Sequence, residues 1–90
     1  MDYLKNKNGK LIRIADEMES LKASVASEYK SLRQEKKMTQ QKFADAAGMN
    51  RVDVSRFESG NYNPSLELLV RCASVLNCDI KFELVPRTEE

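Results

Sequence analysis

Residues 39 to 60, TQQKFADAAGMNRVDVSRFESG, constrain the fold of this chain more than any other stretch, because they predict two short helices joined by a tight turn. Thr39 can cap the first helix, since its hydroxyl can accept a hydrogen bond from the unpaired amides of the first turn. Gly48 follows and can take the left-handed backbone conformation that ends a helix without steric cost. Asn50 can cap the second helix, with Asp53 placed to complete a capping box.

The two predicted helices each divide into an apolar side and a polar side. The positions expected to face inward are apolar, and Ala44 is small where the helices must approach each other. These inward positions are Phe43, Ala44, Ala47, Val54 and Phe57. The outward face of the second helix then consists of Arg51, Val52, Ser55 and Arg56.

This pattern resembles the helix-turn-helix of the Cro and lambda-repressor-like (Xre) family of DNA-binding proteins. The matching segments are TQQKFA, AxxxG and VSRFESG, followed by NPSLELL on the next helix, and the resemblance covers roughly residues 27 to 77. It implies a mostly α fold, a small lambda-repressor-like helical bundle. The second helix of the motif would enter the major groove of double-stranded DNA.

The resemblance also implies which residues meet DNA bases. Arg51 and Val52 match base-facing positions at the start of the recognition helix, and Ser55 and Arg56 match positions one turn later. Arg51 can make a bidentate contact to guanine O6 and N7, and Val52 can pack on a thymine methyl group. Gln40 matches a residue that lies against a phosphate and braces a side chain of the recognition helix.

Other positions match residues that support the family's DNA contacts. Asn50, Ser59 and Asn61 lie where donors commonly meet phosphate, which positions a domain without reading sequence. Arg33 and Glu58 match a structural pair that ties the first helix of the domain to the recognition helix.

Two residues depart from the family pattern. Lys37 stands where a glycine usually ends the first helix, which puts a residue with a Cβ in that turn at a cost of about 1 kcal/mol. Asp53 stands where a small neutral residue usually faces DNA. Its carboxylate would be repelled by phosphate unless it stays engaged at the helix start.

Composition limits the chemistry of the chain. Ninety residues with 41% hydrophobic content support one domain, without room for an enzyme-sized cleft. The sequence has no histidine, no plausible pair of catalytic carboxylates and no glycine-rich phosphate loop, so we expect neither an enzyme nor a cofactor. Cys72 and Cys78 are expected to be reduced packing residues, with no metal. No apolar run is long enough for a membrane span, and we expect a cytoplasmic protein.

The net charge of +1 is unevenly distributed. Residues 33 to 63 carry six basic and four acidic side chains, and residues 1 to 13 carry four basic and one acidic. Residues 14 to 32 and 64 to 90 are both net negative. Because local charge sets counterion release, this distribution permits a nucleic-acid partner.

After the helix-turn-helix domain, expected at residues 27–77, the pattern changes period. Ser65 can cap a helix that ends near Asn77. In residues 78–86, apolar side chains alternate with charged ones, which predicts a β-strand. The apolar members are Ile80, Phe82 and Leu84.

A single strand needs a partner strand. The partner could be residues 10–14, which follow a tight Asn8-Gly9 turn, or the same strand of a second subunit. We favour pairing between subunits in a symmetric dimer. Residues 87–90 are expected to be a disordered tail.

Residues 1–26 are expected to form an extension that is helical from about Lys10. Ser20, Ser24 or Ser27 could cap a fresh start, which would divide this region into two helices. The extension could pack on the core of its own domain, or it could serve dimerisation or docking of a toxin protein.

The function that the sequence favours is a sequence-specific transcriptional regulator, a repressor that binds a pseudo-palindromic operator as a homodimer. Two alternatives stay open. A helix-turn-helix followed by a strand such as CDIKFELVP is similar to antitoxins of type II toxin–antitoxin pairs, which bind a toxin and regulate their own operon. The domain could also be a protein-interaction adaptor that has lost DNA binding, although Arg51 and Arg56 argue against this.

Overall fold

The computed structural model describes residues 3–5 and 11–86, and helices account for most of them. The described elements, in chain order, are β1 (Tyr3–Lys5), β2 (Leu11–Arg13), α1 (Ile14–Glu35), α2 (Gln40–Ala47), α3 (Arg51–Glu58) and α4 (Leu66–Val75). The fold is mostly α, as predicted. Within this described part, no helix has the length and apolar content needed to span a bilayer.

Helix α1 is a single continuous helix of 22 residues, so none of the three serines begins a second one. It begins at Ile14 rather than near residue 10, which corrects the predicted start. The residues just before it form β2, which pairs antiparallel with β1 in the register Leu4 to Ile12. The predicted Asn8-Gly9 turn lies outside the described residues. The N-terminal extension is therefore a short two-stranded sheet followed by the first turns of α1.

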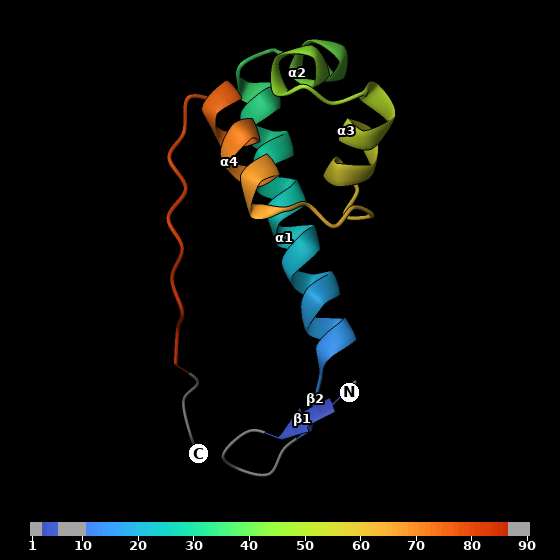
Figure 1. Ribbon diagram of the computed structural model, residues 1–90, viewed down its shortest axis with the longest axis vertical. Helices are drawn as coiled ribbons and strands as arrows, with labels where there is room; N and C mark the ends of the chain where they lie inside the picture. The colour runs from blue at the N-terminus through green and yellow to red at the C-terminus, as the bar shows by residue number, and fades with distance from the viewer. Residues whose placement is uncertain (1–2, 6–10, 87–90) are drawn as a thin grey trace.

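The core lies where α2, α3 and α4 pack around the C-terminal half of α1 (Figure 1). The inward positions predicted for the two short helices are all buried there, and Ala44, Ala47 and Val54 have no exposed surface. Tyr29 of α1 packs edge-on against Phe57 at a ring-centroid distance of 5.2 Å. Its hydroxyl donates to the Leu69 carbonyl of α4, with an O to O distance of 2.9 Å. Helix α1 is thus joined to both α3 and α4.

Side-chain caps begin the three shorter helices. The Thr39 hydroxyl accepts from the Lys42 amide at 3.1 Å, and the Ser65 hydroxyl accepts from the Leu68 amide at the same distance. The Asn50 side-chain oxygen accepts from the Asp53 amide at 2.8 Å. The turn before α2 places Lys37 at a φ of 54°, the left-handed conformation expected where the family usually has glycine.

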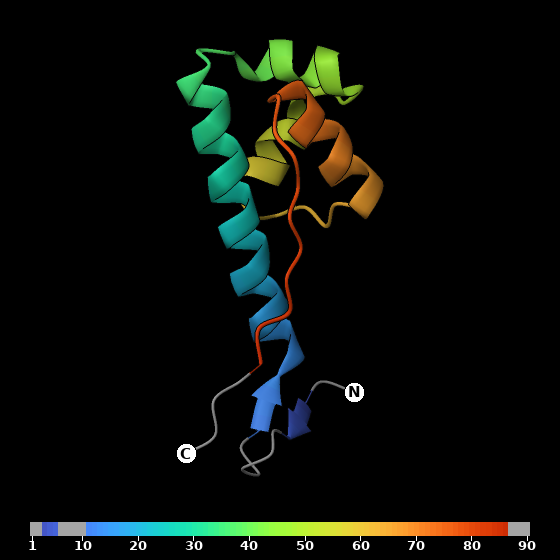
Figure 2. The ribbon, with the colours of Figure 1, turned by 90° about the vertical axis from the view of Figure 1, so that its left-hand side faces the viewer.

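The C-terminal segment, residues 78–86, forms no strand with any described residue, which corrects the expectation for a single chain. It leaves α4 at Cys78, whose amide donates to the Ala73 carbonyl at 2.8 Å, and runs extended beside the bundle (Figure 2). Within the described residues this segment does not pair with β2, whose partner is β1. Pairing between subunits stays a prediction.

Candidate nucleic-acid interface

The turn between α2 and α3 is fixed by backbone geometry at Gly48. Its φ is 71°, and its amide donates to the Ala44 carbonyl, which ends α2. Arg71 of α4 also donates to the Ala47 carbonyl, with an Nη1 to O distance of 3.2 Å. A cation at a helix C-terminus is stabilised by the helix dipole. This contact could not be predicted from the sequence, because Arg71 lies 24 residues from its acceptor.

Helix α3 presents its predicted outward edge to solvent. Val54 and Phe57 face the core, and Asp53 is half-buried. Four other positions of the helix are exposed: Arg51, Val52, Ser55 and Arg56. Val52 is 61% exposed, so its methyl groups are open to solvent. The edge can therefore reach a major groove without any rearrangement of the domain.

A buried ion pair sets the position of α3 relative to α1. The Arg33 guanidinium donates to both carboxylate oxygens of Glu58, with distances of 2.6 Å from Nε to Oε2 and 3.0 Å from Nη2 to Oε1. Arg33 Nη1 also donates to the Met38 carbonyl at 2.6 Å. Gln40 Nε2 donates to Glu58 Oε1 at 3.1 Å. One carboxylate thus connects α1, α2 and α3.

Asp53, in the first turn of α3, is paired within the chain. Its carboxylate lies 3.4 Å from Nη1 of Arg56, one turn later on the same helix. The Arg56 guanidinium also lies over the ring of Tyr62, with Cζ 5.6 Å from the centroid. Such stacking attracts a cation to an aromatic face. Arg56 is therefore held between Asp53 and Tyr62. This role of Tyr62 was not predicted, because the residues around Tyr62 indicate only a turn.

The residues expected at phosphates flank the two ends of α3 and are exposed. Asn50 lies at its N-terminus, and Ser59 and Asn61 lie just after its C-terminus. Asn61 Nδ2 donates to the Ser59 hydroxyl at 3.3 Å, and the Asn61 amide donates to the Arg56 carbonyl at 2.9 Å.

The cysteines lie away from this surface. Both are free thiols, and Cys72 is fully buried, with Sγ 3.9 Å from the sulfur of Met49. Burial raises the pKa of the Cys72 thiol to about 11, with a smaller opposing effect from Arg71. Among the residues that the structure describes, no group of three or more His, Cys, Asp or Glu side chains could hold a metal ion.

Comparison with known proteins finds a family match and a similar phage protein. A family model described as Helix-turn-helix (HTH_3) matches residues 30–82, more than half of the chain. The ImmF control region 10 kDa protein of Bacillus phage phi105 is 41% identical over 51 residues, which cover 57% of this chain and 57% of that protein. The chain thus spans somewhat more than half the length of this relative.

Two solved structures share the fold. The clp gene regulator ClgR from Corynebacterium glutamicum is 26% identical with a TM-score of 0.63, covering 64% of this chain and 62% of that one. The restriction-modification controller protein C.AhdI from Aeromonas hydrophila is 24% identical with a TM-score of 0.65, covering 68% and 88%. This chain belongs to the Xre-like helix-turn-helix family of DNA-binding transcriptional regulators.

Proposed function

We propose that this protein is a transcriptional repressor that binds a pseudo-palindromic operator as a homodimer. The observation that carries the proposal is the exposed edge of α3, held on a rigid base by the Arg33–Glu58 pair. Preformed recognition surfaces bind with less loss of conformational entropy than mobile ones. An exposed edge on a fixed helix is what direct readout of a major groove requires.

In this proposal the residues of α3 make different contacts with DNA. Arg51 lies at the N-terminal end of the helix and donates to guanine O6 and N7, and Val52 packs on a thymine methyl group. Ser55 and Arg56 reach the next base pair or the adjoining phosphate. The pairing with Asp53 fixes the direction of the Arg56 guanidinium and offsets part of its charge. Arg56 therefore contributes more to selectivity than to general attraction.

Contacts with the DNA backbone come from the residues around α3. Gln40 begins α2, and Asn50 and Asn61 flank α3, so all three can donate to phosphates on either side of the groove. Such contacts fix the register of a protein on the duplex but carry no sequence information. They account for affinity on any DNA, whereas the edge of α3 accounts for preference.

Repression follows from occupancy. A dimer would insert two recognition helices into successive major grooves, about 10 base pairs apart, and would exclude polymerase from the promoter. The similarity to a phage control-region protein supports a regulatory role of this kind. No observation favours a toxin partner. An adaptor without DNA binding is disfavoured because α3 exposes two arginines beside an exposed valine.

A binding titration tests the proposal. The protein is titrated into the DNA upstream of its own reading frame and into a random duplex of equal length, at several salt concentrations. We expect the upstream DNA to bind at least about 10³-fold more tightly, and log K to fall linearly with log salt on both. Equal affinity for both duplexes would exclude a sequence-specific repressor of its own promoter.

A further inference from the structure

The N-terminal half of α1 carries an apolar stripe that its own chain leaves uncovered. Met18 is 44% exposed and Leu21 is 66% exposed. Both continue, at helical spacing, the stripe in which Val25 and Leu32 pack against the core. Figure 1 shows the cause: this half of α1 extends beyond α2, α3 and α4. Helix α1 is longer than the core of one chain can cover.

At the edge of the core the stripe forms one wall of an apolar pocket of about 130 Å³. Met18, Leu21 and Val25 line this wall, and the opposite wall includes Tyr62 and Leu69. An apolar cavity of roughly 150 Å³ holds a benzene ring. The pocket is therefore of the right size for one aromatic or branched aliphatic side chain.

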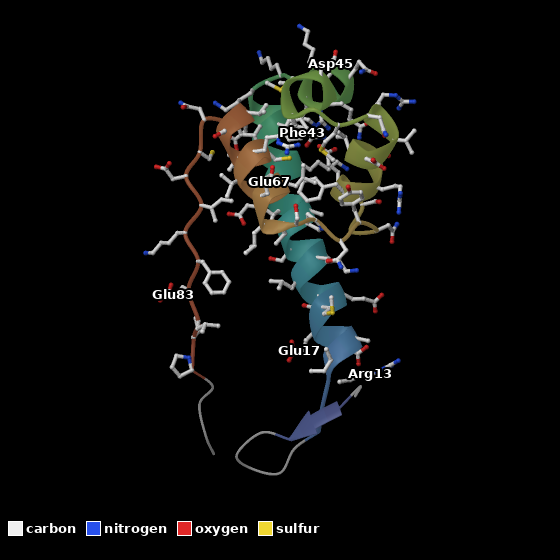
Figure 3. All side chains as sticks on the ribbon, viewed as in Figure 1. Arg13, Glu17, Phe43, Asp45, Glu67 and Glu83 are labelled. Carbon is white, nitrogen blue, oxygen red and sulfur yellow. The ribbon has the colours of Figure 1, made fainter. Side chains whose placement is uncertain are left out.

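The same chain exposes a segment with such side chains, residues 79–85. Phe82 is 79% exposed, whereas the two other phenylalanines, Phe43 and Phe57, are buried in the core. Figure 3 shows Glu83 on the side of the segment that points away from α1. Successive side chains of an extended chain point to opposite sides, so Phe82 lies on the side of α1. Ile80 and Leu84 share the face of Phe82.

We propose that the apolar face of residues 79–85 docks into this pocket on a second copy of the chain, with Phe82 as the side chain that fills it. The inference rests on the homodimer of the proposed function and names the surface that forms it. Twofold symmetry makes the contact reciprocal, because each copy supplies one segment and one pocket. In this dimer, residues 79–85 of each copy pack against α1 of the other copy. The contact does not depend on whether the two segments also pair with each other.

The extent of the exposed apolar surface supports a second copy as the occupant. Seven exposed large apolar side chains belong to α1, α4 and the apolar face of the C-terminal segment: Met18, Leu21, Leu66, Val70, Ile80, Phe82 and Leu84. A standard interface takes about 800 Å² from each partner, and seven such side chains supply an area of that order.

Docking within one chain is less consistent with the geometry. The segment is anchored at Cys78, four residues before Phe82, where the backbone amide donates a hydrogen bond to the Ala73 carbonyl. From that anchor it runs along the bundle with Phe82 exposed, while the pocket on the same chain stays unfilled. The segment of a second copy can reach the pocket from outside, because its anchor belongs to another molecule and does not limit its position relative to this pocket.

Sedimentation equilibrium of the full chain tests the proposal with a matched pair of variants. Phe82→Ser and Glu83→Ser make the same replacement on neighbouring residues that face opposite sides. We expect Phe82→Ser to raise the dimer dissociation constant at least about tenfold, because buried aromatic anchors dominate interface energies. Glu83→Ser should change it less than about twofold, as is usual for an exposed rim charge. Unchanged far-ultraviolet circular dichroism spectra for both variants would show that the fold is intact.

A mixing experiment distinguishes docking of the segment on a second copy from docking of the segment on its own chain. Leu21→Ser alters the pocket and should also weaken the dimer. When Phe82→Ser and Leu21→Ser chains are mixed, the heterodimer keeps one intact contact, so association should exceed that of either variant alone. No recovery on mixing, or wild-type association by Phe82→Ser, would overturn the proposal.

The outcome for this surface is distinct from the outcome for DNA binding. A wild-type chain that stays monomeric across the micromolar range would overturn the docking proposal, even if it still bound DNA. A chain that dimerises as proposed but does not distinguish between duplexes would support the docking surface and refute the repressor.

Discussion

Arg33 on α1 and Glu58 on α3 form a buried ion pair in which Nε lies 2.6 Å from Oε2, and both residues are 8% exposed. The two residues are 25 positions apart in sequence and join α1 to α3. Bidentate arginine–carboxylate pairs are directional as well as strong. The orientation of α3 thus depends on a contact that is buried inside the domain.

Removal of the carboxylate should destabilise the whole domain. In Glu58→Ala, the Arg33 guanidinium stays buried without its partner, and breaking such a pair typically costs about 3–5 kcal/mol. Urea denaturation should show a loss of unfolding free energy of that size. Glu67→Ala is the matched control, because its ion pair with Arg71 is exposed and should contribute less than about 1 kcal/mol. Similar losses in the two variants would contradict this view of the pair.

Neutralisation of Asp53 should strengthen binding to any DNA. In Asp53→Asn the negative charge beside Arg56 is removed, so the protein gains about one effective phosphate contact. We expect higher affinity for a random duplex and a log–log salt slope steeper by about one. Glu67→Gln makes the same change of charge on α4, and its effect should be smaller. A lower affinity for random DNA in Asp53→Asn would show that Asp53 supports binding instead of restraining it.

Arg51 should contribute to sequence preference and not only to attraction. We expect Arg51→Ala to cost about 1–3 kcal/mol on the upstream DNA and to relax preference at one base pair. Lys30→Ala removes the same charge from α1 and should weaken both duplexes slightly and equally. Anisotropy titrations on upstream and random DNA measure both effects. An equal loss on the two duplexes in Arg51→Ala would assign Arg51 to phosphate contact.

The buried thiol should be inert in the native state. Only the thiolate reacts, and burial raises the pKa of Cys72 from 9.0 to about 11. At pH 8, a thiol reagent should therefore modify the half-buried Cys78 first, and Cys72 only after unfolding. Rapid modification of both thiols in the native protein would show that the core opens readily.

The same pKa shift predicts a dependence of stability on pH. Since the folded-state pKa of Cys72 is raised above the unfolded value, the neutral thiol is favoured in the fold. Its stabilisation is complete below pH 9 and should be lost as the pH rises from about 9 toward 11. Melting temperatures across this range, compared with those of Cys72→Ala, isolate the contribution. A parallel decline in both proteins would assign the loss to other groups.

The local parts of the fold could be predicted from the sequence because local chemistry determines them. Thr39, Asn50 and Ser65 cap helices through hydrogen bonds that span three residues. The left-handed turn at Gly48 likewise depends on one residue. The buried side of α2 and α3 follows from spacing alone. Contacts of this kind need no knowledge of the rest of the chain.

The parts that could not be predicted depend on partners distant in sequence. Alternation in residues 78–86 predicted a strand, but a strand forms only where another one can pair with it, and β2 pairs with β1. The start of α1 moved to Ile14 for the same reason. The contact between Arg71 and Ala47 and the position of Tyr62 over Arg56 arise from the packing of whole helices.

Selection of duplexes from a random-sequence library by the purified protein is the most direct test of the central claim that α3 reads DNA sequence. The account predicts enrichment of inverted half-sites whose centres lie about 10 base pairs apart. It also predicts that selection with Arg51→Ala loses preference at one position in each half-site. Retention of all sequences in equal proportion by the wild-type protein would contradict it.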